Sequence, residues 1–289
     1  MRYHLALLFF GISISLVAQD KPAYRVFTSE GKKSDYSDIL REASRTDFIF
    51  FGELHDNPIA HWLELEITKD LFSAKSKNMV LAAEMFETDN QILIDEYLDG
   101  IVKESSFETE IRKWPNYLTD YKPLLSFAKE NGLKFIASNI PRRYASVVSS
   151  GGFEALDKIT AEGKKFIAPL PIEYDPELPC YKDMLAMSGG PMGHASANLP
   201  KAQAIKDATM AWSITRNWQK GQVVIHFNGS YHSDRHMGII WYVKKVLPDA
   251  RIVTVSTVQQ DDTNKLNDDF KGTADFIIVV PSSMTKTYK

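Results

Sequence analysis

Cysteine is almost absent from this sequence, since Cys180 is the single one in 289 residues. One thiol excludes an intrachain disulfide framework. The glycine-rich phosphate loops of nucleotide-binding proteins and the nucleophile elbow of serine hydrolases are also missing. The formal net charge is −3, so neither nucleic acid nor an anionic membrane surface is an expected partner. With 44% hydrophobic and 25% charged residues, the composition is that of an ordinary globular protein.

The first 19 residues have the pattern of a secretory signal peptide. Arg2 and His4 precede a mostly apolar run at 5–17, and small side chains follow before Asp20. That run is short for a membrane span, and a retained anchor is the alternative. No cysteine closes this segment to accept a lipid. We therefore expect an exported protein, periplasmic or secreted, without a transmembrane segment in its mature chain.

Short apolar runs alternate with amphipathic segments, which predicts an α/β fold. The runs are continuous, as in parallel strands that are buried on both faces. We expect one domain over 20–281, with three layers (α/β/α), a mainly parallel sheet and a helical and loop insertion at about 140–220. The lead-in before residue 45 is largely polar, and the tail at 282–289 is expected to be disordered. The predicted strands are 48–51, 79–83, 135–138, 223–227, 252–255 and 276–280, and the predicted helices are 58–74, 91–98, 124–130, 142–160, 201–218 and 237–246.

Ionisable side chains gather where the predicted strands end. Glu53 and His55 follow the first strand, Glu84 follows the second, and His232 follows the fourth. Ligands of such sheets bind beyond the carboxyl ends of the strands. Two histidines and two glutamates at one edge therefore predict a metal or acid–base site.

Each of these side chains also has a structural explanation. Glu53 can cap the helix that follows it, and a single histidine such as His55 is often only a hydrogen-bonding residue. Glu84 can pair with Arg142 or Arg143, and His232 can be a surface loop residue. Two further side chains, at positions 61 and 62, are predicted to belong to a helix face and not to a site.

The segment 168–200 holds six of the thirteen prolines, which predicts a long irregular loop. Tyr174, Tyr181 and His194 lie in it, together with several methionines. A flap of this composition could cover a flat apolar cofactor and ligate its iron. Alternatively, the methionines fill a loosely packed loop core.

Seven short motifs occur in a fixed order between residues 45 and 247. They are FGELHDN (51–57), AEMF (83–86), YKPL (121–124), NIPR (139–142), SGG (150–152), QAIKDATMA (203–211) and NGSYHSDR (228–235). With these motifs the chain resembles the ChaN-like haem-binding family, in the wider grouping of the TIKI proteases and the erythromycin-esterase-like proteins.

The resemblance implies a three-layer α/β core and an exported haem-binding protein linked to iron acquisition. It also implies that two haems can stack in a homodimer, with tyrosine as the iron ligand. Glu53, His55, Glu84 and His232 fall in matching motifs, and His194 falls where relatives place a histidine. Well-known members are described as lipoproteins, whereas this chain lacks the lipid-acceptor cysteine.

Two functions follow from these observations. In the first, the protein binds haem; the candidate ligands and propionate partners are His194, Tyr174, Tyr181, Tyr231, Arg142, Arg143 and Arg235. In the second, it is a peptidase or esterase in which His55, His232 and Glu84 hold a divalent metal such as zinc or manganese. Glu53 would then act as general base on water. A scaffold with a vestigial site is a third reading.

Overall fold

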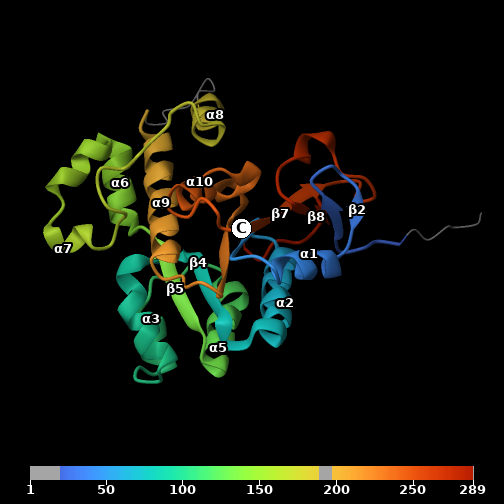
Figure 1. Ribbon diagram of the computed structural model, residues 1–289, viewed down its shortest axis with the longest axis horizontal. Coiled ribbons are helices and arrows are strands. Elements are labelled where there is room, and N and C mark those ends of the chain that lie inside the picture. Colours follow the sequence, from blue (N-terminus) through green and yellow to red (C-terminus); the bar gives the residue numbers. More distant parts are fainter. Residues whose placement is uncertain (1–19, 189–196, 289) are drawn as a thin grey trace, which may run out of the picture.

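The computed structural model describes residues 20–188 and 197–288. Its centre is a sheet of eight strands in the order β2-β1-β8-β7-β3-β6-β4-β5 (Figure 1). All pairings among β3 to β8 are parallel, whereas β1 pairs antiparallel with β2 and β8. The predicted α/β fold with a mainly parallel sheet is therefore confirmed. The strands are β1 Arg25–Thr28, β2 Lys33–Ser34, β3 Phe48–Glu53, β4 Met79–Glu87, β5 Lys134–Asn139, β6 Val223–Gly229, β7 Ile252–Gln260 and β8 Phe276–Pro281.

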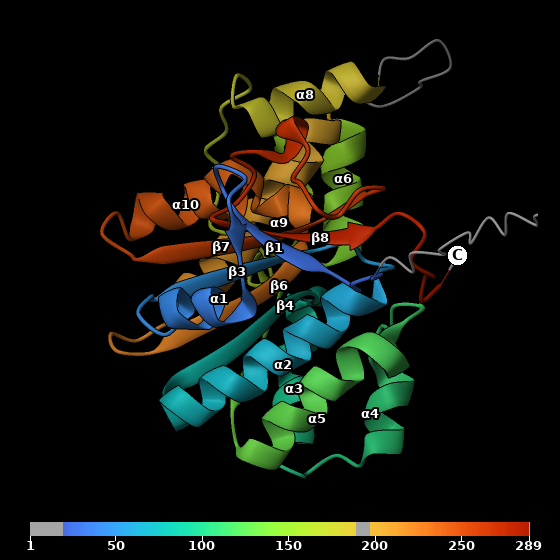
Figure 2. The same ribbon diagram turned by 90° about the vertical axis from the view of Figure 1, so that its right-hand side faces the viewer.

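Helices cover both faces of this sheet. Figure 2 shows α2, α3, α4 and α5 below the sheet and α6, α9 and α10 above it. Ile49 and Phe51 pack into the core on the α2 side, while Phe48 and Phe50 pack into the core on the α9 side. Because successive side chains of a strand point to opposite faces, β3 has to be apolar throughout. The helices are α1 Tyr36–Ala43, α2 Pro58–Lys75, α3 Gln91–Leu98, α4 Glu104–Glu110, α5 Lys122–Asn131, α6 Arg142–Gly151, α7 Ala161–Lys164, α8 Pro179–Ser188, α9 Leu199–Thr215 and α10 Ile239–Val246.

Short helical turns join these elements, and two of them reach the strand ends. They are η1 Ser76–Asn78, η2 Thr88–Asn90, η3 Tyr117–Tyr121, η4 Phe153–Lys158, η5 Ser230–His232, η6 Asp234–His236 and η7 Asp268–Phe270. The turn η3 is a single turn of π-helix before α5, and η5 follows β6 directly. Such π-helical turns are often found at functional sites.

Local sequence fixes the ends of the helices around the site. The Asn57 side chain caps α2, since its Oδ1 accepts hydrogen bonds from the N–H groups of Ile59 and Ala60 at 3.0 and 3.1 Å. Pro58 occupies the first helical position, where a missing N–H costs nothing. Gly132 ends α5 with φ 61°, a left-handed conformation that glycine adopts readily. Thus α2 begins immediately beyond the carboxyl end of β3.

Three segments differ from the sequence-based expectations. The lead-in forms β1 and β2, which are too short to show a periodicity, and the eight-residue helix α1, which was not expected. The expected loop at 168–200 contains the ten-residue helix α8. The tail is ordered over 282–288: the Thr287 N–H donates to the Asp56 carbonyl at 2.9 Å, and Lys286 Nζ lies 2.8 Å from Asp56 Oδ1. The expected disorder of the tail is therefore wrong for these residues.

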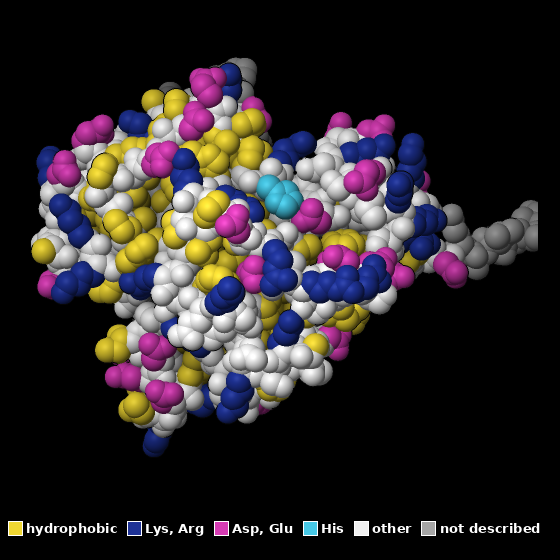
Figure 3. Space-filling model, viewed as in Figure 1, with side chains coloured by type: hydrophobic (Ala, Val, Ile, Leu, Met, Phe, Trp, Pro, Cys, Tyr) yellow, Lys and Arg dark blue, Asp and Glu magenta, His cyan; other side chains and the backbone are white. Residues whose placement is uncertain are grey.

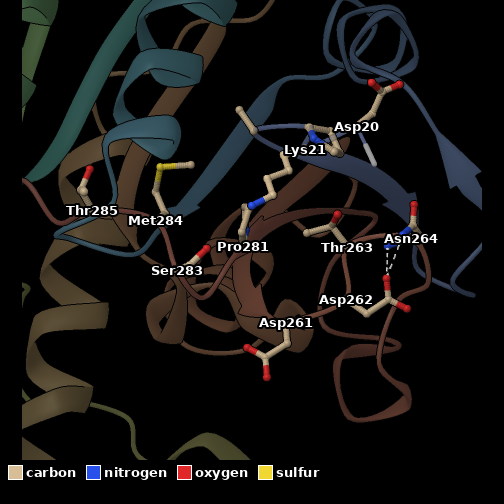
Figure 4. Close-up of a pocket in the computed structure, with 12 residues that line it drawn as sticks. Asp20, Lys21, Asp261, Asp262, Thr263, Asn264, Pro281, Ser283, Met284 and Thr285 are labelled. Atoms are coloured by element: carbon tan, nitrogen blue, oxygen red, sulfur yellow. Dashed lines mark hydrogen bonds between the residues drawn. The ribbon is translucent and has the colours of Figure 1, made fainter. Parts of the chain in front are cut away.

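A cavity of about 790 Å³ opens between residues 20–23, the loop after β7 and the tail. Figure 4 shows the Asn264 side chain and backbone donating to Asp262 in its wall. None of the candidate functional residues lines this cavity, so it is not the site that the strand ends predict. Within the described ranges, no helix has both the length and the apolar character needed to cross a membrane.

Candidate functional site

Parallel pairing aligns the carboxyl ends of β3, β4 and β6 at one edge of the sheet. In this register Gly52 lies beside Asn228, and Glu53 lies beside Gly229. The Gly229 N–H also donates to Glu84 Oε2 at 2.8 Å. Glu53 and Glu84 therefore flank the same glycine, and two separate groups of polar side chains are built outward from them.

The first group, the α2 cluster, consists of Glu53, His61, Glu64 and Asp120. His61 Nδ1 lies 3.4 Å from Glu53 Oε2 and 3.0 Å from Glu64 Oε2. His61 Nε2 lies 3.0 Å from the His55 carbonyl oxygen and 3.4 Å from Asp120 Oδ2. The four cluster side chains are at most 5% exposed. One imidazole thus faces three carboxylates in the absence of bulk water.

The two oxygens of Glu53 have different surroundings. Oε1 accepts from the Tyr121 hydroxyl at 2.7 Å and contacts His55 Nδ1 at 2.6 Å. Oε2 accepts no hydrogen bond, and neither does Glu64 Oε1. The Asn116 amide donates to the His55 carbonyl at 2.9 Å and to Asp120 Oδ2 at 2.6 Å. The α2 cluster therefore contains two buried carboxylate oxygens without a donor.

Burial and close charges shift the pKa values of the α2 cluster. Burial would raise the pKa of Glu53, but hydrogen bonds from His55 and His61 and the charge of His61 lower it below its ordinary value. Burial and the neighbouring Glu53 raise the pKa of Glu64 well above its ordinary value. Burial would lower the pKa of His61, but its bonds to Glu53 and Glu64 raise it to about 11. Without a bound cation, protons on His61 and Glu64 have to offset the negative charge of the α2 cluster.

The second group, the α9 cluster, consists of Glu84, Asp207 and His232. His232 lies between the two acids, with Nδ1 2.5 Å from Asp207 Oδ1 and Nε2 3.2 Å from Glu84 Oε1. The Tyr181 hydroxyl donates to Asp207 Oδ2 at 2.8 Å, and Gln203 Nε2 lies 3.1 Å from His232 Nδ1. Because the Gly229 N–H fills Glu84 Oε2, each carboxylate oxygen in this cluster has a partner.

The pKa values of the α9 cluster follow from this pairing. Burial would raise the pKa of Glu84, but the charge of His232 and its hydrogen bond lower it to about 2. Burial would lower the pKa of His232, but the charges of Glu84 and Asp207 raise it to about 10. Burial raises the pKa of Asp207 despite the nearby imidazolium. The geometry favours a charged His232 held between carboxylates.

His55 lies between the two clusters, and part of its side chain is exposed to solvent. Its Nδ1 contacts Glu53, while its Nε2 lies so close to Gly229 that an added Cβ there would sit 2.6 Å away. The His55 ring packs against Trp114 with a centroid distance of 4.8 Å. Burial would lower its pKa, but the bond to Glu53 and the charge of Glu84 raise it. The His55 side chain is 33% exposed, so it is the polar group through which small molecules can approach.

A cavity of about 320 Å³ adjoins Glu84 on the side of α6 and α9. Met85 and Trp114 contribute apolar and aromatic wall, and Arg142 and Lys206 contribute two cations. This cavity brings Arg142, a predicted propionate partner, to the strand-end site. Figure 3 shows hydrophobic side chains gathered on the face of the molecule over α6 and α9.

The predicted tyrosines lie apart from this cavity. Tyr181 is fully buried, and its hydroxyl is engaged by Asp207. Tyr174 is half-buried, with its ring 5.5 Å from that of Tyr181. Tyr231 is 36% exposed, and its hydroxyl donates to the Cys180 carbonyl.

The remaining predicted residues are dispersed. Arg143 pairs with Asp89 at 2.5 Å, and Arg235 is exposed with a left-handed backbone, φ 58°. The predicted pairing of Glu84 with Arg142 or Arg143 is not observed, because His232 and a backbone N–H occupy the Glu84 carboxylate. His194 lies outside the described residues.

Sequence reasoning missed part of the α2 cluster. Trp62 is 48% exposed on the helix face as expected, whereas His61, on the same helix, is buried against Glu53 and belongs to the α2 cluster. The reason is that α2 begins one short turn after β3, and its first turn therefore returns to the strand end. Glu64 stands three positions after His61, which places both on one helix face. That spacing was the available signal.

A family model described as haem-binding uptake, Tiki superfamily, ChaN matches residues 39–243. Among solved structures, the chain is similar to ChaN of Campylobacter jejuni, which is described with cofacial haem binding; the TM-score is 0.66 with 18% identity over 89% of this chain and 96% of that one. A Bacillus cereus protein gives a TM-score of 0.50 with 10% identity over 92% of this chain and 97% of that one. At these identities the likenesses show the fold.

Among curated proteins, the chain is similar to the chloroplastic protein RETICULATA-RELATED 5 of Arabidopsis thaliana. The two are 24% identical over an alignment of 180 residues, and the match covers 58% of this chain. The matched stretch spans only 24% of the length of that curated relative.

Proposed function

The chain belongs to the ChaN family of haem-binding uptake proteins in the Tiki superfamily, and we propose that it is an exported protein that binds haem for haem or iron uptake. The family match over residues 39–243 carries this proposal. Residues 39–243 include every residue of both clusters and of the cavity beside Glu84.

The chemistry of that cavity supports a haem edge as its occupant. A tetrapyrrole is flat and apolar and carries two carboxylates. Met85 and Trp114 offer apolar contact, and the guanidinium of Arg142 suits a carboxylate. Lys206 provides a second positive charge in the same wall. In this proposal a haem enters edge-first, and a second copy of the chain covers the part that stays outside.

Among the three predicted tyrosines, Tyr231 is our proposed iron ligand. It is the most exposed of them, whereas Tyr181 is buried and engaged by Asp207. Burial raises the pKa of Tyr231 to about 12, so iron has to displace its proton. His194 remains a second proposed ligand.

A haemin titration of the chain tests this function. We expect a saturable shift of the Soret band, and the Tyr231→Phe variant should alter its position. The Arg142→Gln variant should weaken binding about tenfold, as expected for the loss of one charge-assisted hydrogen bond. Arg143→Gln is the matched control, because Arg143 pairs with Asp89. A wild-type chain without any Soret shift at micromolar haemin would overturn the proposal. Light scattering with and without haemin tests the homodimer.

A metal-dependent hydrolase is the second candidate, and it is favoured by His232 Nε2, 3.2 Å from Glu84 Oε1, and by His55 Nε2 beside Gly229. His55, His232 and Glu84 would hold zinc or manganese, which would supply Lewis-acid chemistry. Glu53, whose pKa is lowered, is an ionised base beside His55. Hydrolysis of a peptide or ester by haem-free protein, abolished in Glu53→Gln, would support this candidate. Absence of hydrolysis across an ester and peptide panel would exclude it in favour of haem binding.

A further inference from the structure

We infer that the α2 cluster is itself a site for a first-row divalent metal ion, held by Glu53, His61 and Glu64. Its three ligands differ from the residues of the haem cavity and from the metal ligands predicted around Gly229, although Glu53 also contacts His55 at 2.6 Å. It lies on the opposite side of the sheet edge, between β3 and α2, and the inference does not rest on haem binding.

The spacing of the three side chains matches a metal site. One potential ligand atom from each of them lies within 4.8 Å of the other two. His61 Nδ1 stands 3.4 Å from Glu53 Oε2 and 3.0 Å from Glu64 Oε2. Ligands about 2.1 Å from a metal are about 3.4 Å apart in a tetrahedral site and about 3.0 Å apart in an octahedral one. Little movement is therefore needed to admit an ion.

The outer contacts of His61 prepare its Nδ1 as a ligand. Its Nε2 faces the His55 carbonyl at 3.0 Å, and a carbonyl oxygen can only accept, so Nε2 carries a proton. Asp120 Oδ2 lies 3.4 Å from the same nitrogen. A carboxylate or carbonyl behind the far nitrogen is the usual arrangement for a metal-bound histidine. When a cation displaces the Nδ1 proton, the Nδ1 lone pair becomes available on the side of Glu53 and Glu64.

The carboxylate oxygens give an independent sign of a missing cation. Glu53 Oε2 and Glu64 Oε1 are buried without a hydrogen-bond partner, and both side chains have no exposed area. Leaving such atoms unpaired is costly. In the neighbouring α9 cluster, every carboxylate oxygen has a donor or an imidazole within 3.2 Å. Of the two clusters, only the α2 cluster therefore has carboxylate oxygens without a hydrogen-bond donor.

The ligand set narrows the choice of ion. One imidazole nitrogen and two carboxylate oxygens suit zinc, manganese or ferrous iron. An all-oxygen set would suit magnesium or calcium, and a thiolate set would suit copper(I). The two carboxylates also balance the two positive charges of the ion in a buried site. His55, at 33% exposure, marks the side from which the ion can enter.

Elemental analysis and cobalt spectroscopy test the site. The full chain is treated with chelator, desalted, and then incubated separately with Zn²⁺ and Mn²⁺ before a second desalting. We expect about one equivalent of one of these ions to remain. Co²⁺ should give visible absorption bands that Zn²⁺ abolishes. Glu64→Gln, which keeps the shape of the side chain, should weaken metal retention at least tenfold, and His61→Gln should do the same.

Two controls locate the ion. Glu66→Gln lies on the same helix at a half-buried position where Glu66 pairs with Lys69 at 2.9 Å, so it should keep the metal. His232→Ala removes a ligand predicted around Gly229 and should also keep it. Metal that is lost in His232→Ala but kept in Glu64→Gln would overturn the inference, as would a wild-type chain that retains no ion. A haemin titration of Glu64→Gln that still gives a Soret shift separates this site from the proposed function.

Discussion

The α2 and α9 clusters face each other across Gly229 and are built from the same residue types, yet they solve the problem of buried charge differently. In the α9 cluster, His232 lies between Asp207 and Glu84, and a tyrosine and a backbone N–H fill the remaining oxygens. In the α2 cluster, one histidine faces three acids, and two oxygens have no donor.

We call the α9 cluster, in which protein groups satisfy every carboxylate oxygen, a closed network. The α2 cluster, in which two carboxylate oxygens lack a donor, is an open one. A buried ion pair is stable only when its remaining lone pairs and protons are satisfied. The α9 cluster meets that condition with protein groups alone, so its role can be to orient His232 rigidly at the strand end. The α2 cluster meets it only with additional protons or a cation. Without a cation, removal of a carboxylate should therefore cost more stability in the α9 cluster than in the α2 cluster.

The largest expected effect comes from breaking the closed network. Asp207→Ala leaves a buried imidazolium with one acid instead of two and strands the Tyr181 hydroxyl. We expect a loss of about 3–5 kcal/mol in the free energy of unfolding, the cost of removing one partner of a buried pair. Urea denaturation followed by circular dichroism measures it. Asp207→Asn keeps one acceptor and should cost clearly less. Equal stability of Asp207→Ala and wild type would show that this network does not contribute to the fold.

The contact between the clusters gives the next largest effect. In Gly229→Ala the new Cβ would lie 2.6 Å from His55 Nε2, so the imidazole has to move away from Glu84. We expect a destabilisation of about 1–3 kcal/mol, typical of overpacking. The matched test is a double-mutant cycle with His55→Ala, because removal of the ring should remove most of the cost. A cost that persists in the double mutant would mean that the backbone, and not His55, opposes the alanine.

The pH dependence of stability tests the closed network with a smaller expected effect than these substitutions. The pKa of Glu84 falls from its ordinary 4.5 to about 2, so its stabilisation is present above pH 4.5 and is lost as the pH falls toward 2. The pKa of His232 rises from 6.5 to about 10, so its stabilisation is complete below pH 6.5 and is lost as the pH rises toward 10. The raised pKa of Asp207 opposes part of this gain.

The difference in unfolding free energy between wild type and His232→Gln isolates that contribution. We expect this difference to be largest between about pH 4.5 and 6.5 and to shrink on either side. A flat difference across pH 4 to 9 would contradict a charged His232 in the folded state.

The sequence was sufficient to predict the sheet and its reactive edge, because both depend on short-range patterns. Continuous apolar runs identify six of the strands, and three of these runs end close to the polar residues that gather at the edge. Glu53 and His55 follow directly from that rule. The lead-in strands β1 and β2 have four and two residues, which is too short for a period to develop.

The acids that complete the clusters could not be predicted in the same way. Asp207 is in a helix that is buried on nearly all sides, so periodicity does not distinguish its face. Asp120 comes from a π-helical turn, whose geometry no simple spacing rule predicts. His61 and Glu64 look like the polar face of an amphipathic helix until α2 is docked against β3. The partners of Asp207 and Asp120 are distant in sequence, and His61 and Glu64 meet Glu53 only through the packing of α2 on β3.

The smallest expected effect is the sharpest test of the contrast between the clusters. In chelator-treated protein, Glu64→Gln should change the unfolding free energy by at most about 0.5–1 kcal/mol, because it removes a carboxylate that lacks a full set of donors. Glu84→Gln should cost more, since Glu84 accepts from Gly229 and pairs with His232. Addition of Zn²⁺ or Mn²⁺ should then stabilise wild type and Glu84→Gln but not Glu64→Gln, since only a ligand that binds the native state raises its stability. Thermal melts of the three proteins with and without the ion measure both differences. If Glu64→Gln were as costly as Glu84→Gln without metal, protein groups alone would already balance the α2 cluster, and the two clusters would be equivalent.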